Sequence, residues 1–82
     1  MKFLRMKPGH GDVLLAEGDP ASTLDEDRLI GEFRRQLEAG MWAAVPQLDP
    51  ATRRREARMV LDYADVPVDA ERVIFFPRAA GG

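Results

Sequence analysis

The sequence closes with the stretch ERVIFFPRAAGG, residues 71–82. Within it, residues 73–76 are a run of β-branched and aromatic side chains, which predicts a buried strand. Pro77 ends this strand, because proline has no amide hydrogen to donate to a neighbouring strand. The residues after Arg78 are small and have little surface to pack. The stretch therefore predicts a rigid strand that leads directly into a thin tail.

The tail ends in Gly81 and Gly82, two residues without a β-carbon. Such a tail can enter a narrow channel, and nothing beside its last carbonyl hinders attack on it. This suits a carboxylate that another enzyme activates and transfers. A frayed chain end or a remnant of a cloning linker gives the same sequence, and both explanations stay open at this point.

Length and composition exclude several classes of protein. A chain of 82 residues predicts one domain with a small core. The chain has no cysteine, which excludes a thiol nucleophile, a disulfide framework and the common zinc motifs. We expect a cytoplasmic protein without a secretory or membrane-spanning segment. Its net charge is −2 with both signs interspersed, so we expect neither nucleic acid nor a membrane as a partner.

The first half of the chain predicts a hairpin followed by a helix. Residues 2–7 and 12–17 are apolar-rich runs joined by Pro-Gly-His-Gly, a sequence typical of a tight turn. Residues 24–39 have apolar side chains at helical spacing and acidic residues in the first turn. Gly40 follows the last turn, as is typical of a helix end. Thr23 and Glu26 have the spacing of a capping box. We expect one stripe of this helix to pack on a sheet.

The second half predicts further strands. Residues 41–45 indicate a short strand ended by Pro46, in which Trp42 fills the core. Residues 47–56 predict a polar loop, and residues 64–70 predict a turn region. Residues 58–63 fit either an edge strand or the end of a helix that starts after Asp49, since the run is too short to separate the two periods. We favour the strand.

Together these elements predict an α+β fold, in which a mixed sheet of four or five strands packs on one helix. The first and last strands are the most apolar, so we expect them to lie centrally and to pair in parallel. One face of each strand then lacks a helix. That face carries one of two sets of side chains, which the sequence does not separate: Phe3, Ile74 and Phe76, or Leu4, Val73 and Phe75. We take the first set as the candidate partner surface, because exposed apolar patches usually mark one; a homodimer contact remains the alternative.

This order of elements, ending in a strand that runs into Gly81-Gly82, resembles a β-grasp ubiquitin-like protein. Residues 69–82, with acidic residues, an apolar run, proline, small residues and Gly-Gly, are similar to the endings of small bacterial ubiquitin-like proteins. The resemblance implies a β-grasp domain over residues 1–77 and a flexible tail over residues 78–82. The chain departs from eukaryotic ubiquitin in having Pro-Arg-Ala-Ala before the di-glycine. Its only lysines are Lys2 and Lys7, which puts polymeric chains in doubt.

The resemblance implies a protein modifier that is not itself an enzyme and holds no cofactor or metal. An E1-like activating enzyme uses ATP to adenylate the terminal carboxylate and passes it to a cysteine as a thioester. The acyl group ends as an isopeptide on a lysine amine of a target protein. Gly82 would be the acyl donor and Gly81 the second slim residue, with tail docking by Arg78, Ala79 and Ala80. An E2-like conjugating enzyme and a JAB-type deconjugating peptidase are further implied partners.

Two other functions stay open. A sulfur carrier with the same fold would convert the carboxylate of Gly82 to a thiocarboxylate, and a noncovalent adaptor would make no use of the di-glycine. No catalytic cluster is visible. His10 lies in a turn without reactive neighbours, and residues 25–27 are explained by the positive end of the helix dipole. The three arginines at 53–55 lack interleaved aromatic residues and are a weak sign of nucleic-acid binding.

Overall fold

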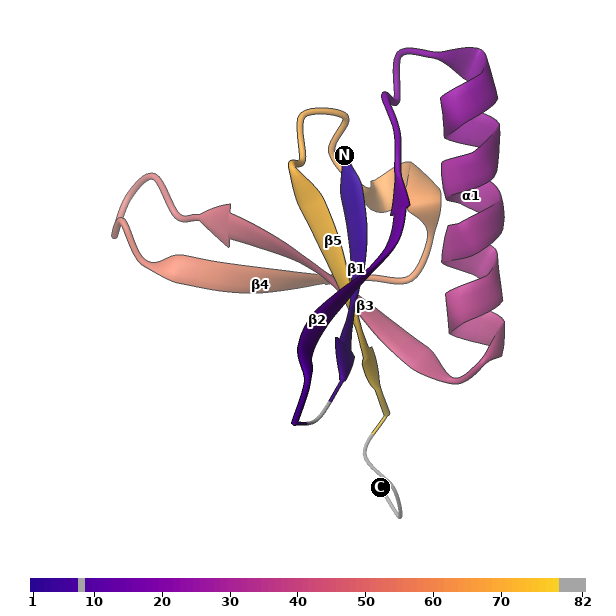
Figure 1. Ribbon diagram of the computed structural model, residues 1–82. Helices are drawn as coiled ribbons and strands as arrows, with labels where there is room; N and C mark the ends of the chain where they lie inside the picture. The colour runs from indigo at the N-terminus through magenta and orange to yellow at the C-terminus, as the bar shows by residue number, and fades with distance from the viewer. Residues whose placement is uncertain (8, 79–82) are drawn as a thin grey trace.

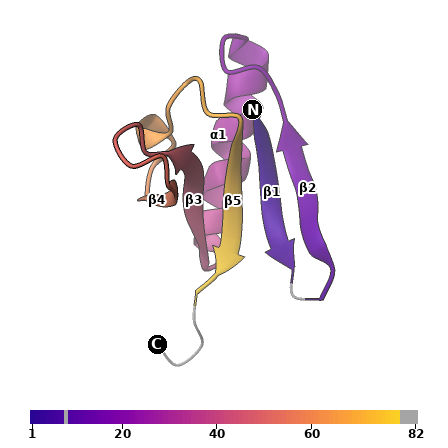
Figure 2. The same cartoon turned by 90° about the vertical axis from the view of Figure 1, so that its left-hand side faces the viewer.

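The computed structural model describes residues 1–7 and 9–78, which form a mixed sheet packed on one long helix (Figure 1). The five strands have the order β2-β1-β5-β3-β4 in the sheet. In Figure 2 the helix α1 lies behind the sheet, so the viewer faces the side that has no helix. The α+β prediction is confirmed, and the arrangement is consistent with a β-grasp fold. In chain order the elements are β1 (Lys2–Lys7), β2 (Gly11–Glu17), α1 (Thr23–Glu38), β3 (Met41–Leu48), β4 (Arg55–Val60), the short 3₁₀ helix η1 (Tyr63–Asp65) and β5 (Arg72–Pro77).

The strand β5 lies at the centre of the sheet, as its apolar sequence predicts. It pairs in parallel with β1 on one side and antiparallel with β3 on the other. The strands β1 and β2 form the predicted hairpin, and β3 and β4 form a second one. The predicted parallel pairing of the first and last strands is therefore confirmed, and the connection between them contains α1.

The core between α1 and the sheet is built on three phenylalanines. The rings of Phe3 and Phe75 meet edge to face with centroids 5.4 Å apart, and Phe33 of α1 lies 5.5 Å from Phe75 and 6.2 Å from Phe3. Edge-to-face contact brings the positive ring edge to the negative ring face, which adds to the hydrophobic effect. Leu29 and Val73 complete the set of fully buried large side chains. The packing of α1 depends on this cluster.

The predicted assignment of Phe3 to the exposed partner surface is wrong. Phe3 is fully buried, because β1 pairs with β5 in a register that places it beside Val73. Each of the two predicted sets therefore combined side chains from both faces of the sheet. The face toward α1 carries Phe3, Val73 and Phe75, and the opposite face, which we name the outer face, carries their neighbours Leu4, Ile74 and Phe76.

Two predictions for β3 are also wrong. Pro46 does not end the strand, which continues to Leu48 as the partner of β4. Beyond Ala44 the pairing with β5 stops, so β3 has an open side there, where a proline costs no hydrogen bond. Trp42 does not fill the core. It lies half-buried on the outer face, while its neighbours Met41 and Ala43 are buried.

The remaining boundaries follow the sequence with small shifts. The predicted edge strand at 58–63 is β4, but it begins earlier, within the expected polar loop, and ends at Val60. The helix ends as predicted, with Gly40 at φ 87° after the C-cap Ala39. None of the helices in the described part of the chain is long and apolar enough to cross a membrane.

The start of α1 differs from the predicted capping box. Its N-cap is Ser22, which makes no side-chain cap bond, and Thr23 is already helical. Asp25 instead ties the preceding loop to the helix: its Oδ2 accepts a hydrogen bond from the amide of Asp19 at 2.9 Å, and its Oδ1 accepts one from Arg28 at 2.8 Å. The Asp19 amide first, and Arg28 second, hold the pKa of Asp25 below its ordinary value of 3.8. Asp25 and Glu26 lie in the first turn of α1, where the positive end of the helix dipole favours acidic side chains.

Candidate functional site

The outer face carries a continuous apolar row that crosses every strand of the sheet. The strand registers give the row directly, because residues paired across neighbouring strands share a face. Leu14 of β2 pairs with Leu4 of β1, and Leu4 pairs with Ile74 of β5. Ile74 pairs with Ala44 of β3, which in turn pairs with Met59 of β4. Five apolar residues therefore lie side by side on the sheet face opposite α1.

The ends of this row are open to solvent. Leu14 is 53% exposed and Met59 is 48% exposed, whereas Leu4 and Ile74 in the middle are half-buried. Met6, two residues after Leu4 on the same strand, is also 48% exposed. Large apolar side chains that gather on one face of a monomer usually mark a binding surface. We name the following residues the outer apolar patch: Leu4, Met6, Leu14, Trp42, Ala44, Met59, Ile74 and Phe76.

The patch reaches the C-terminal end of β5 through an aromatic pair. Trp42 of β3 and Phe76 of β5 are direct partners in the antiparallel ladder. The guanidinium carbon of Arg78 lies 4.6 Å from the centre of the Trp42 ring, which is a cation–π contact. The backbone amide of Arg78 also donates a hydrogen bond to the carbonyl oxygen of Gly40 at 3.3 Å. The chain is thus held on the sheet for one residue beyond β5.

Of the residues predicted for tail docking, Arg78 belongs to the described part of the chain. Its contact with Trp42 places its charge beside the outer apolar patch. Ala79, Ala80, Gly81 and Gly82 lie outside the described residues. Of the predicted partner surface, Ile74 and Phe76 lie in the patch and Phe3 does not. Trp42 could not be identified from sequence as the partner of Arg78, because residues 41–45 are apolar without alternation and do not reveal which side chains face outward.

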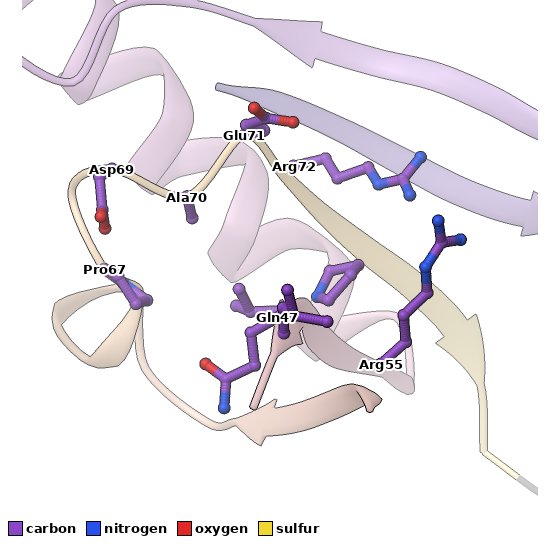
Figure 3. Close-up of a pocket in the computed structure, with 10 residues that line it drawn as sticks. Gln47, Arg55, Pro67, Asp69, Ala70, Glu71 and Arg72 are labelled. Atoms are coloured by element: carbon purple, nitrogen blue, oxygen red, sulfur yellow. The ribbon is translucent and has the colours of Figure 1, made fainter. Parts of the chain in front are cut away.

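A groove adjoins the patch where β3 and β5 separate. It has a volume of about 610 Å³ and lies between the end of β3, the start of β4 and the segment that leads into β5 (Figure 3). Arg55 and Arg72 line it near the strands, and Asp69 and Glu71 line it near the loop. Nothing in the sequence pattern marks this groove, since its residues come from three separate segments.

The other candidate side chains have simpler roles. Lys2 lies 3.8 Å from Glu17 across the β1–β2 pair, at a site where both side chains are more than half exposed. His10 is exposed in the turn between β1 and β2. No cluster of acidic, histidine or cysteine side chains able to hold a metal occurs within residues 1–7 and 9–78. The features of the described residues that stand out are the outer apolar patch, Arg78 over the Trp42 ring, and the groove.

Comparisons of the chain with protein-family models, with curated proteins and with solved structures found no match.

Proposed function

We propose that this chain is a bacterial-type ubiquitin-like modifier, whose glycine carboxylate is activated by another enzyme and transferred to amines of target proteins. The observation that carries this is the position of β5. It is the central strand of the sheet, and Arg78 continues it along β3 toward the sequence Ala-Ala-Gly-Gly. The strand β5 is paired on both sides as far as Phe75, and β3 and Gly40 hold it on as far as Arg78, so the sequence after Arg78 starts from a fixed point.

The chemistry needs only a carboxylate from this chain. A carboxylate oxygen of Gly82 attacks the α-phosphorus of ATP, and pyrophosphate leaves. A cysteine thiolate of the activating enzyme then attacks the acyl carbon, and AMP leaves. Finally a target amine attacks the thioester, the thiolate leaves, and the proton that the amine nitrogen loses converts the thiolate to a thiol as the isopeptide forms. The chain is thus the substrate of these steps, and the activating enzyme binds and consumes the ATP.

The outer apolar patch supplies the surface that such enzymes need. An activating enzyme must bind the folded domain firmly enough to place a thin tail in its active site, because binding energy from remote contacts positions the reacting group. The patch lies on the same sheet as the root of the tail, and Arg78 adds a positive charge at its border. We propose this face for docking of the E1-like activating enzyme. An E2-like conjugating enzyme and a JAB-type deconjugating peptidase are the further proposed partners.

The test is a comparison of two N-terminally tagged versions in the native host, the full chain and one that lacks Gly82. We expect blots to show higher-mass adducts with the full chain and none with the shortened one. Intact mass of the free protein must also show a chain that ends at Gly82. A native chain that extends past Gly82, or adducts that persist in the shortened version, would contradict the proposed function. A free protein in which sulfur replaces one oxygen of Gly82 would identify a sulfur carrier instead.

The outer apolar patch also favours a second candidate, a noncovalent binding module. The two functions differ in their need for the carboxylate. A few residues added after Gly82 block acyl transfer but leave the patch free, whereas Ile74→Asp places a charge in the middle of the patch. A binding module keeps its partner in the extended chain and loses it in the Ile74→Asp variant. A modifier loses its adducts in the extended chain.

A further inference from the structure

The groove beside the outer apolar patch is bordered by two open strand edges. The strands β3 and β5 pair only over residues 41–44 and 74–77. Beyond that point β3 stays paired with β4 as far as Leu48, and β5 stays paired with β1 as far as Arg72. Within the described residues, the backbones of residues 45–48 and 72–73 therefore have a neighbouring strand on one side alone. An open edge of this kind is a template for an added strand.

The two edges diverge because the sheet is strongly twisted. In Figure 1 the β3–β4 hairpin runs from beneath α1 across the sheet and turns away from β5 and β1. Pro46 lies at the point of divergence, where it has no amide hydrogen to offer to β5. The separation leaves a groove of about 610 Å³, which has room for an extended segment of a few residues. Its apolar lining comes from Val45, Pro46, Leu48, Pro67 and Ala70.

The charged residues of the groove are separated by sign. Arg55 and Arg72 lie on opposite sides of the groove, and Figure 3 shows their side chains pointing toward one another. The strand registers place both on the outer face, because Arg72 comes two residues before Ile74 and Arg55 comes four residues before Met59. In the described part of the chain neither arginine pairs with a carboxylate. Asp69 and Glu71 give the other end a negative charge.

We infer that this groove binds an extended peptide segment of a partner protein as an added strand along residues 45–48 of β3. An acidic side chain of the segment lies between Arg55 and Arg72, and a basic side chain lies beside Asp69 and Glu71. Two guanidinium groups without a carboxylate form a strong site for one, since arginine binds carboxylates with paired hydrogen bonds. A nucleic-acid strand fits less well, because Asp69 and Glu71 repel its phosphates and because half of the lining residues are apolar.

This binding is independent of the proposed acyl transfer, since it uses no residue of the tail. The probe is a labelled seven-residue peptide of alternating valine and threonine, with a glutamate near one end and a lysine near the other. The same peptide in reversed order covers the opposite strand direction. We expect one of the two to bind, and replacement of its glutamate by glutamine to weaken binding about tenfold. In ¹⁵N-labelled protein, the amides of Gln47, Leu48, Arg72 and Val73 should shift on binding.

Three variants test the role of the two arginines. In the Arg55→Gln, Arg72→Gln double variant the glutamate and glutamine peptides should bind equally. The matched control Arg34→Gln, on the exposed side of α1, should keep the tenfold difference. In the Arg55→Glu, Arg72→Glu variant the preference should reverse, so that a peptide with lysine in place of glutamate binds more tightly. A gain of binding in this last variant also shows that the fold is intact.

Several results would overturn the inference. Equal binding of the glutamate and glutamine peptides to the wild-type chain would exclude the arginine pair as the recognition site. Shifts confined to the amides of Leu4 and Ile74 would move the binding to the outer apolar patch. A short single-stranded oligonucleotide that binds more tightly than the peptide, and depends on Arg55 and Arg72, would assign the groove to nucleic acid. Deletion of Gly82 should leave peptide binding unchanged, which separates this result from a failure of the modifier function.

Discussion

The two faces of the sheet are built from the same strands, and in β1 and β5 both carry large apolar side chains, but the two faces differ in burial. On the face toward α1, Phe3, Val73 and Phe75 are completely buried. On the outer face their immediate neighbours are only half-buried, and the flanking Leu14 remains 53% exposed. The composition of a strand therefore does not decide which of its side chains are buried. The presence of a second layer decides it, and for the face without a layer we propose partner binding as the reason for its apolar side chains.

The largest expected difference between the faces concerns adjacent phenylalanines of β5. Phe75→Ala removes a ring from the core cluster, and we expect a loss of about 3–5 kcal/mol in the free energy of unfolding. Phe76→Ala removes a half-buried ring of the outer face, and we expect a loss of about 1–2 kcal/mol. Urea denaturation followed by circular dichroism measures both. Because so small a domain has little stability to lose, Phe75→Ala can unfold it. Phe75→Leu is therefore the milder companion variant, with an intermediate loss in the free energy of unfolding.

Equal losses for Phe75→Ala and Phe76→Ala would contradict the distinction between the two faces. A loss larger for Phe76→Ala would mean that the outer face is covered, by a second copy of the chain or by another layer. Sedimentation at two protein concentrations separates these cases.

A smaller change in the free energy of unfolding, of opposite sign, is expected from replacing a polar residue on the buried side of α1. Gln36 of α1 lies on the same stripe as Leu29 and Phe33 and is only 7% exposed. Within the described residues its Oε1 has no hydrogen-bond partner. A buried acceptor without a partner costs free energy, so Gln36→Leu should stabilise the protein by about 1 kcal/mol.

The matched control for this change is Gln47→Leu, because Gln47 is exposed at the end of β3. We expect it to alter the free energy of unfolding by less than about 0.5 kcal/mol. If Gln36→Leu destabilises the protein, its amide has a partner in solution, such as a bound water molecule.

The smallest expected effect belongs to the contact between Arg78 and Trp42 on the outer face. A double-mutant cycle with Arg78→Gln and Trp42→Leu should give a coupling of about 0.5–1 kcal/mol, the range of a cation–π contact at an exposed site. Thermal or urea unfolding of the four proteins measures it. A coupling of zero would show that Arg78 is not held over the ring, and would leave the root of the tail without its side-chain anchor.

Much of the fold could be predicted from sequence because the signals are local. The hairpin of β1 and β2 follows from two apolar runs around a glycine-rich turn, and α1 follows from its apolar period and from Gly40 at its end. The central place of β5 follows from residues 73–76, which carry large apolar side chains on both faces. For the candidate site, Ile74, Phe76 and Arg78 were found in this way, since all three belong to the β5 stretch and its continuation.

The features that were predicted wrongly, or not predicted at all, depend on contacts between segments far apart in the chain. Phe3 was assigned to the wrong face because the alternation within β1 gives two equivalent sets, and only the pairing of Phe3 with Val73 selects one. A proline ends a strand that has neighbours on both sides. Pro46 does not end β3, because β3 is no longer paired with β5 at that point. The groove with Arg55 and Arg72 arises from the same divergence, which no local pattern encodes.

The sequence by itself determined the first hairpin, the helix and the apolar strand at residues 73–76, and it predicted the parallel pairing of β1 with β5. Local propensities and periodicity suffice for the individual elements, since each depends on residues within one segment, and the pairing of β1 with β5 follows from the apolar character of both strands. Only the tertiary structure decided which side chains of each strand face α1, that Trp42 lies beneath Arg78, and where β3 leaves β5. These depend on strand register and sheet twist, and a register shift of one residue turns every side chain of a strand to the opposite face.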